Sequence, residues 1–157
     1  MLDVASAERV IDHGVDSGAD FAELFIERSL SNSISTLSQQ VQSVESGIDF
    51  GIGIRLVFGD KVLYGYTNKT ADDELKRIIS ELAAMDLRDP RISRAAFNFS
   101  NPQERHPARA TLSVDAEVES KIAYLRAADT AAKAASNLIA QSRGACRGKE
   151  QRVEIFN

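Results

Sequence analysis

The side chains best suited to metal or nucleophilic chemistry are few and scattered along the sequence. The chain has two histidines, His13 and His106, and one cysteine, Cys146. Zinc sites need three or four such ligands, usually paired at short spacings, and neither histidine has a second ligand near it. Cys146 lies between Arg143 and Arg147, but the histidine that would activate it as a nucleophile cannot be assigned. These residues therefore predict no catalytic set and no metal site within this chain.

Glycines between residues 43 and 68 form a second pattern that could bind a ligand. Gly51-Ile52-Gly53 resembles the start of a dinucleotide-binding loop. That loop needs a third glycine, where this sequence has Leu56, and a helix directly after it, where this sequence predicts another strand. Because no helix N-terminus is available to hold phosphates, the pattern argues against nucleotide binding.

The same glycines predict a bare patch of sheet. A strand glycine often marks the place where another backbone approaches closely, and Gly51, Gly53 and Gly65 have this character. Packing of a helix is favoured for this patch, and an extended peptide is the alternative. Arg55 is predicted on the same face, either exposed or paired with a carboxylate such as Glu45, and contact with a substrate carboxylate is the alternative. The predicted substrate- or partner-contact residues are Gly51, Gly53, Arg55 and Gly65.

The segment that carries these residues predicts a β-hairpin. Apolar side chains alternate with glycine, arginine and valine through residues 50–58, which is the period of a strand with one buried face. The side chains predicted to be buried are Phe50, Ile52, Ile54, Leu56 and Phe58. Gly59-Asp60 supplies the residue with positive φ that a two-residue turn requires, and the alternation resumes in residues 62–66.

Three helices are predicted around the sheet. The first covers residues 2–17 and ends at Gly18. The second begins at Thr70, whose hydroxyl would form a capping box with Asp73, and the third begins at Ser113. The residues predicted to face inward are Leu75, Ile78, Ile79 and Leu82 in the second helix and Val118, Ile122, Leu125 and Ala132 in the third.

The rest of the chain predicts further strands and one irregular segment. Residues 19–28 predict a central strand, because apolar side chains occur on both of its faces. Residues 30–46 predict a weaker, partly exposed strand or pair of strands, and residues 138–156 predict a closing hairpin with its turn near Gly148-Lys149. Residues 86–112 contain all three prolines and predict an irregular Pro/Arg-rich loop.

Composition is that of a soluble globular protein. The chain has 157 residues, 43% apolar and 27% charged, a length that suits one core better than two. The net charge of −4 argues against nucleic-acid binding. The lack of a long apolar run or signal peptide argues against a membrane partner, and the single cysteine fits the cytoplasm. The predicted fold class is α/β (α+β), a single domain over residues 1–157 with a mostly antiparallel mixed β-sheet and about three packing helices.

The order and spacing of several short motifs resemble the N-terminal domain of the TldD/PmbA family. The motifs lie at residues 18–24, 43–45, 51–55 with Gly59, 64–67 and 151–157. Members of this family are known as modulators of DNA gyrase and as metallopeptidases that mature microcins. The resemblance extends over essentially the whole chain and is loosest across residues 86–112.

What the resemblance implies concerns mainly a longer parent protein. Family members hydrolyse peptides with zinc held by an H-E-x-x-x-H helix and a later cysteine, all beyond the N-terminal domain. This sequence has no His-Glu pair, and Cys146 is not identified with the metal-ligand cysteine. Zinc is therefore expected only in a full-length parent, no cofactor is expected in this chain, and whether the chain itself is an enzyme stays open.

Two classes of function follow. The resemblance implies a non-catalytic N-terminal domain of a metal-dependent peptidase that helps form a dimeric scaffold and a substrate cavity. Its partners would be a like subunit, in a homodimer or heterodimer, and a peptide substrate in the parent. The alternative is a stand-alone truncated paralogue that acts as a protein–protein interaction module, because an open sheet with exposed edges can pair with another chain.

Overall fold

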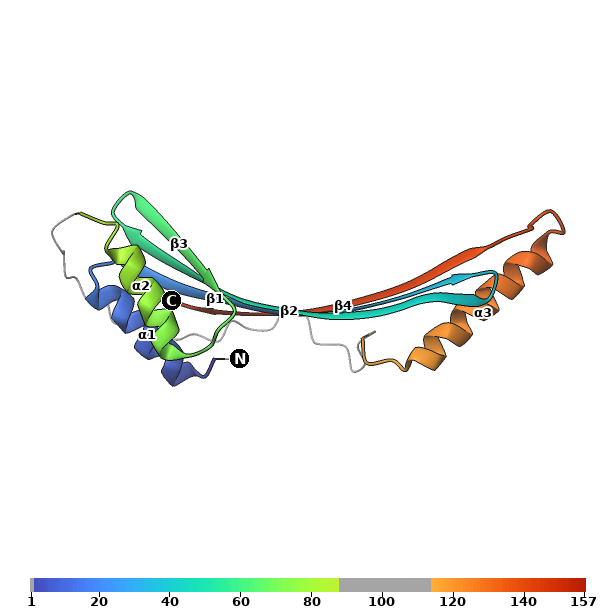
Figure 1. The fold of residues 1–157 in the computed structure, drawn as a ribbon, viewed down its shortest axis with the longest axis horizontal. Coiled ribbons are helices and arrows are strands. Elements are labelled where there is room, and N and C mark those ends of the chain that lie inside the picture. The colour runs from blue at the N-terminus through green and yellow to red at the C-terminus, as the bar shows by residue number, and fades with distance from the viewer. Residues whose placement is uncertain (1, 88–113) are drawn as a thin grey trace. The chain divides into compact units, whose positions relative to one another are not determined.

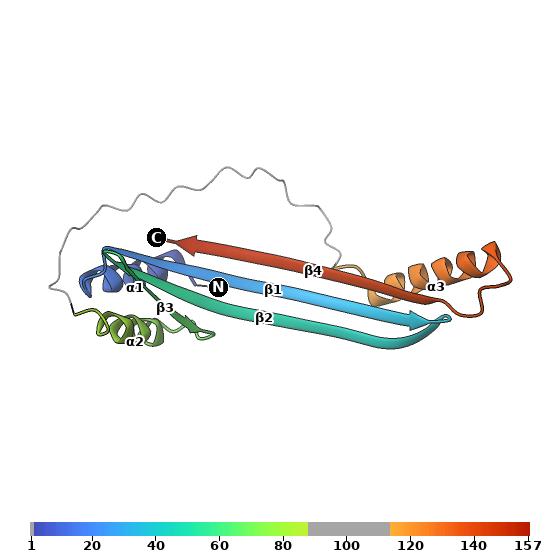
Figure 2. The same ribbon diagram turned by 90° about the horizontal axis from the view of Figure 1, so that it is seen from above.

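The computed structural model describes residues 2–87 and 114–157, which form three helices and four strands (Figure 1). In chain order these are α1 (Val4–Asp16), β1 (Phe21–Leu37), β2 (Gln40–Phe58), β3 (Lys61–Thr67), α2 (Asp72–Ala83), α3 (Val118–Ala135) and β4 (Arg143–Phe156). The strands form one sheet in the order β3-β2-β1-β4, and β1 runs opposite to both β2 and β4 (Figure 2). The predicted α/β fold class, with a mostly antiparallel sheet and about three helices, is confirmed.

Contacts within the chain divide it into two compact units, which we describe separately. Unit 1 contains Met1–Arg28, Phe50–Gln103 and Arg152–Asn157, and unit 2 contains Ser29–Asp49 and Glu104–Gln151. Strands β1, β2 and β4 contribute residues to both units. One domain over residues 1–157 stays a prediction, and the predicted loop at 86–112 falls, from residue 88 onward, outside the described residues.

Unit 1 contains an apolar core between one face of the sheet and helices α1 and α2. Alternate residues of β2 are buried in it, as predicted from their period of two. The core includes Ile52, Ile54, Leu56 and Phe58 from β2, Leu24 and Ile26 from β1, Val10 and Ile11 from α1, and the predicted stripe Leu75, Ile78, Ile79 and Leu82 from α2. Phe50 is partly buried against the same cluster.

Helix α1 matches the predicted first helix, and both of its ends are capped. The carboxylate of Asp3 accepts a hydrogen bond from the backbone N–H of Ser6 at 2.8 Å, which satisfies a donor that the helix leaves free. Gly18 has a φ of 97° and donates its N–H to the carbonyl of Val15 at 2.9 Å. The glycine therefore ends the helix in the left-handed conformation that other residues rarely adopt.

The predicted capping box at the start of α2 is wrong. The N-cap is Ala71 instead of Thr70, and no side chain caps the helix. The first turn instead carries acidic side chains at positions 72–74, which favour the positive end of the helix dipole. Asp72 also forms an ion pair with Arg9 of α1 at 2.8 Å, so the two helices are joined by charge at their surface.

The hairpin of β2 and β3 is confirmed. The two strands pair antiparallel from Ile52↔Thr67 to Phe58↔Lys61. Gly59 occupies the first turn position with a φ of 58°, as in a type II′ turn. Its N–H donates to the carboxylate of Asp20 at 2.6 Å, which ties the turn to the residue before β1.

Unit 2 contains a second hairpin, and one of the two predicted alternatives for residues 30–46, a strand pair, is the one observed. β1 continues well past the predicted end at residue 28. The chain turns at Ser38 and Gln39, which both have positive φ, 46° and 69°. This is the pattern of a type I′ turn, although neither residue is the usual glycine or asparagine.

The predicted closing hairpin at residues 138–156 is wrong, because β4 is a single strand. Gly148, the predicted turn residue, is buried within the strand. Gly144 lies close to α3, where an added Cβ would be 3.1 Å from Cδ2 of Leu125. The glycines in this segment thus include a site of close packing, a role that sequence alone does not separate from a turn.

Helix α3 begins at Val118, later than the predicted start at Ser113, which lies outside the described residues. The predicted inner face is wrong in part, since Val118 is exposed while Leu125 is buried. The other buried residues of the helix are Lys121 and Asp129. The aliphatic stem of a lysine can cover apolar surface while its charge reaches water, which explains how Lys121 can face inward.

Candidate functional site

The four predicted contact residues lie on β2 and β3 of unit 1, but on two faces of the sheet. Gly51, Gly53 and Arg55 share the face away from the buried side chains of β2. Gly65 lies on the other face, where an added Cβ would be 2.6 Å from Cγ2 of Ile78 in α2. The structure therefore does not bring Gly65 together with the other three, and the close approach there is helix packing.

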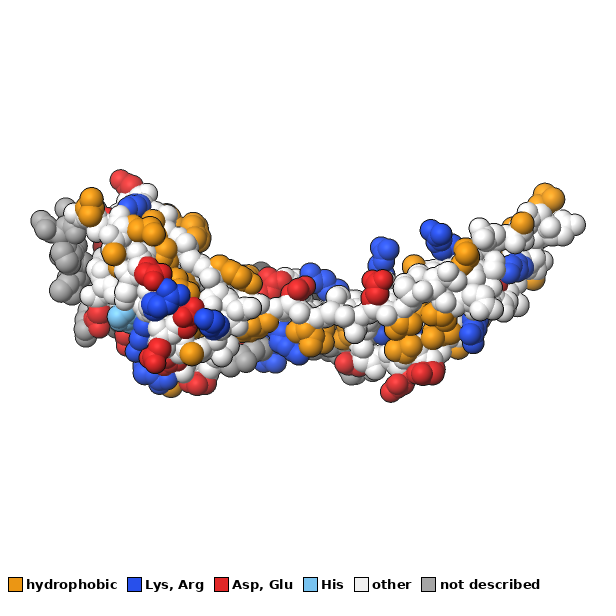
Figure 3. All heavy atoms as spheres, viewed as in Figure 1, with side chains coloured by type: hydrophobic (Ala, Val, Ile, Leu, Met, Phe, Trp, Pro, Cys, Tyr) orange, Lys and Arg blue, Asp and Glu red, His pale blue; other side chains and the backbone are white. Residues whose placement is uncertain are grey.

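Gly51 is covered by a side chain of the neighbouring strand. An added Cβ would lie 2.4 Å from the hydroxyl of Tyr66, and that hydroxyl donates to the carbonyl of Phe50 at 3.4 Å. At Gly53 the nearest atom to an added Cβ is 3.7 Å away, which is ordinary contact. Tyr64 and Tyr66 are 69% and 70% exposed, and apolar side chains gather over β3 (Figure 3).

Arg55 pairs with a carboxylate, but the partner differs from the one named in the sequence analysis. Its guanidinium lies 3.1 Å from a carboxylate oxygen of Glu23 on β1, and Glu45 belongs to unit 2. The guanidinium also lies 5.2 Å from the ring centroid of Phe21. A partly exposed ion pair of this kind contributes about 0.2–1 kcal/mol. Contact of Arg55 with a substrate carboxylate stays a prediction.

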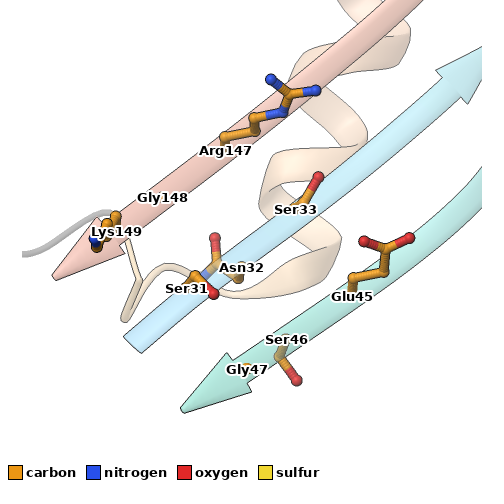
Figure 4. Close-up of a pocket in the computed structure, with 9 residues that line it drawn as sticks. All are labelled: Ser31, Asn32, Ser33, Glu45, Ser46, Gly47, Arg147, Gly148 and Lys149. Atoms are coloured by element: carbon orange, nitrogen blue, oxygen red, sulfur yellow. The ribbon is translucent and has the colours of Figure 1, made fainter. Parts of the chain in front are cut away.

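A hollow of about 480 Å³ lies on the sheet of unit 2 (Figure 4). Three neighbouring strands each supply three residues: Ser31, Asn32 and Ser33 from β1, Glu45, Ser46 and Gly47 from β2, and Arg147, Gly148 and Lys149 from β4. The volume falls within the roughly 300–1,000 Å³ of small-molecule sites, but the lining is polar where such sites are mostly apolar. Recognition here would therefore depend on charge and hydrogen bonds.

Short side chains on the middle strand and long charged ones on the flanking strands shape this hollow. Ser33, Glu45 and Arg147 extend to the same side of the three strands, whereas Ser46 extends to the other (Figure 4). Glu45, Arg147 and Lys149 are exposed, and no ion pair or hydrogen bond joins any of them to another residue in the described ranges. Charges of opposite sign therefore flank a floor of serines and are available to a ligand.

Asn32 adds an unused acceptor. Its Nδ2 donates to the carbonyl of Val114 at 3.2 Å, which holds the side chain in place. Its Oδ1 is buried and has no hydrogen-bond partner within the described part of the chain. An unsatisfied buried acceptor destabilises a protein by about 1–3 kcal/mol, so a donor supplied from outside would be favourable.

The groups that line the hollow offer charges and hydrogen bonds to a ligand. Within residues 2–87 and 114–157, no group of three His, Cys, Asp or Glu side chains is placed to hold a metal ion. Cys146 is a free, partly exposed cysteine on β4. Sequence analysis missed the hollow because its three parts become neighbours only through the strand order; the one available signal was serine at alternate positions 31, 33 and 35.

Among the helices that the structure describes, none is long and apolar enough to cross a membrane.

Part of the chain matches a known family. Residues 22–86, which run from β1 to just past α2, match the family model described as PmbA/TldA metallopeptidase domain 1. No curated protein matches the chain.

Solved structures share the fold. One is a proposed modulator of DNA gyrase from Bacteroides thetaiotaomicron, with a TM-score of 0.68, 14% identity, and coverage of 97% of this chain and 36% of that one. TldE from Thermococcus kodakarensis has a TM-score of 0.61 and 16% identity, and the match covers 96% of this chain and 34% of TldE. A proposed modulator of a DNA gyrase from Thermotoga maritima has a TM-score of 0.55 and 9% identity, and the match covers 96% of this chain and 37% of that one.

These likenesses are unequal in extent. The structural matches cover nearly all of this chain at low identity and show its fold, while the chain spans only about a third of the length of those proteins. The family resemblance predicted from the motifs is confirmed over residues 22–86, which match the model of that family's first domain.

Proposed function

We propose that this chain is the non-catalytic N-terminal domain of a TldD/PmbA-like metal-dependent peptidase. The observation that carries the proposal is the match of residues 22–86 to the first domain of that metallopeptidase family. The fold supports it, because nearly the whole chain superimposes on about a third of longer proteins. In such a parent the domain would help form a dimeric scaffold and the walls of a substrate cavity in the cytoplasm.

The chemistry would then belong to the rest of the parent. There a zinc ion would activate a water molecule for attack on a peptide carbonyl, with a glutamate as general base. This chain would contribute position and shape. Its sheet offers one means of doing so, since an extended peptide can add to an exposed strand edge through backbone hydrogen bonds.

The direct test is to purify this chain and measure zinc content and peptide hydrolysis together. We expect zinc well below one equivalent per chain and no cleavage above buffer, with or without added zinc. Stoichiometric zinc together with cleavage that a chelator abolishes would overturn the proposal. A thermal unfolding curve on the same sample shows that the inactive chain is folded.

One observation favours the alternative, a stand-alone interaction module. β3 pairs with β2 only over Ile52–Phe58, so the described residues place no strand beside the earlier part of β2 on that side. Val44 and Ile48 in this part are 52% and 63% exposed. An open, partly apolar edge can pair with another chain. A reading frame that continues past Asn157 into an H-E-x-x-x-H helix would decide for the peptidase domain, and a stop codon there would decide for the module.

A further inference from the structure

We propose that the hollow on unit 2 binds a short peptide with a free ammonium and a free carboxylate terminus. The carboxylate would lie at Arg147 and Lys149, and the ammonium at Glu45. This inference rests on the proposed function, because a peptidase scaffold would meet such peptides as products.

The spacing of the strands that carry the charged side chains matches the length of a short peptide. β1 lies between β2 and β4, and adjacent strands are about 4.8 Å apart, so the two charged strands are about 10 Å apart. Three extended residues span about 10–11 Å. A tripeptide can therefore reach both walls, whereas a single amino acid carries its two charges too close together to do so.

The side chains present match the groups of such a peptide. A guanidinium binds a carboxylate through two parallel hydrogen bonds, which makes Arg147 the stronger of the two basic partners. Lys149 follows two residues later on the same strand and so projects to the same side. Between the walls, the hydroxyls of Ser31 and Ser33 can serve the amide groups of the peptide, whereas the intervening Asn32 projects to the other face of the strand.

The opposite charges of the hollow are not explained as a structural ion pair. Glu45 and Arg147 lie on strands separated by β1, and neither pairs with the other or with another described residue. A purely anionic ligand would make no favourable contact with Glu45 and would be repelled by its carboxylate. The dual charge therefore favours a zwitterion over a free anion such as acetate or phosphate.

The test is an NMR titration of the isotopically labelled chain at low ionic strength, where exposed charge pairs are least screened. The probes are trialanine, N-acetyl-trialanine, trialanine amide, alanine and acetate. Because exposed ion pairs are weak, we expect trialanine to bind with a dissociation constant on the order of 1 mM. Blocking either terminus should weaken binding about threefold to fivefold, and alanine and acetate should bind more weakly still.

Variants then assign each terminus to a wall. In Glu45→Gln, acetylating the peptide should make no further difference. In the double variant Arg147→Gln with Lys149→Gln, amidating the peptide should make none. Matched controls are Asp49→Asn on β2 and Arg143→Gln on β4, exposed charges outside the hollow that should leave binding within twofold of the parent chain. Unchanged resonances away from the hollow would show that each variant is folded.

The inference is overturned if blocked and free trialanine bind equally, if acetate binds as tightly as trialanine, or if the controls weaken binding as much as the hollow variants. Its failure is distinguishable from failure of the proposed function. Absence of any trialanine-induced shift in a chain without zinc or cleavage removes only this inference, whereas zinc-dependent cleavage removes only the non-catalytic role.

Discussion

Unit 1 and unit 2 share three strands but bury different kinds of side chain. In unit 1 helices α1 and α2 cover a continuous apolar core. In unit 2 the buried apolar side chains among the described residues are Ile34 and Leu125, and the buried polar ones are Ser29, Thr36, Lys121 and Asp129. Apolar burial is the main stabilising term in folding, so unit 1 should hold the fold together while unit 2 keeps its polar groups for contacts.

The largest effect should come from truncating a leucine in each unit. Leu56 is fully buried in the core of unit 1, and Leu56→Ala should lower the free energy of unfolding by about 3 kcal/mol through lost transfer energy and a residual cavity. Leu125 packs α3 on unit 2 with few apolar neighbours, so Leu125→Ala should lower it by about 2 kcal/mol. Urea denaturation of both variants measures the difference, and a larger loss for Leu125→Ala would reverse the ranking of the units.

Alanine substitutions at two glycines of unit 1 test how closely its elements pack at each position. Gly65→Ala places a methyl group 2.6 Å from Ile78, and relieving that overlap should destabilise the fold by roughly 1–3 kcal/mol. Gly53→Ala meets only ordinary contacts at 3.7 Å and should stabilise the strand by about 0.5 kcal/mol. Thermal unfolding distinguishes the two. Equal effects at both sites would show that α2 does not pack tightly on Gly65.

The two hairpin turns give opposite predictions. Gly59 in unit 1 has a φ of 58°, so Gly59→Ala should destabilise the fold by about 1 kcal/mol. Ser38 in unit 2 has a φ of 46° without being glycine, so Ser38→Gly should stabilise it by about 0.5 kcal/mol, after the greater freedom of glycine in the unfolded chain is counted. Chemical denaturation measures both, and a loss of stability in Ser38→Gly would contradict the type I′ turn.

Acidification should weaken unit 1 by a small amount. Hydrogen bonds from Arg77 hold the pKa of Glu74 below its ordinary value of 4.5, and the backbone N–H of Ser6 holds that of Asp3 below 3.8. Since these folded-state pKa values are lowered, the stabilisation is present above the ordinary values and is lost as the pH falls through the folded-state values. Melting temperatures between pH 6 and pH 2.5 measure the loss. Glu74→Gln should reduce the pH dependence, and an unchanged dependence would rule out this ion pair as its source.

Local sequence patterns were sufficient to predict the hairpin and the buried helix face of unit 1. The alternation through residues 50–58, the turn at Gly59 and the stripe on α2 each express one rule of periodicity or turn geometry, and the structure confirms them. The cap at Thr70 failed because the N-cap of α2 is one residue later, at Ala71, and a shift of one residue removes the capping geometry.

Unit 2 was harder to predict because its features arise between distant segments. Gly148 indicated a turn but lies within β4, since a glycine serves a turn and a close contact equally well. Lys121 and Asp129 are buried, although charged side chains usually lie exposed on a helix. The hollow requires β4 to lie beside β1, an order that no local pattern reveals.

The central claim is that unit 1 provides the stable scaffold and unit 2 the contact surface. Amide hydrogen exchange of the whole chain, with and without trialanine, tests it most directly, because exchange reports stability segment by segment. The account predicts strong protection in β2 and β3 over residues 52–67 that trialanine leaves unchanged. It also predicts weaker protection in residues 31–33, 45–47 and 147–149 that trialanine increases. Equal protection in both units, or a peptide-induced change confined to unit 1, would contradict it.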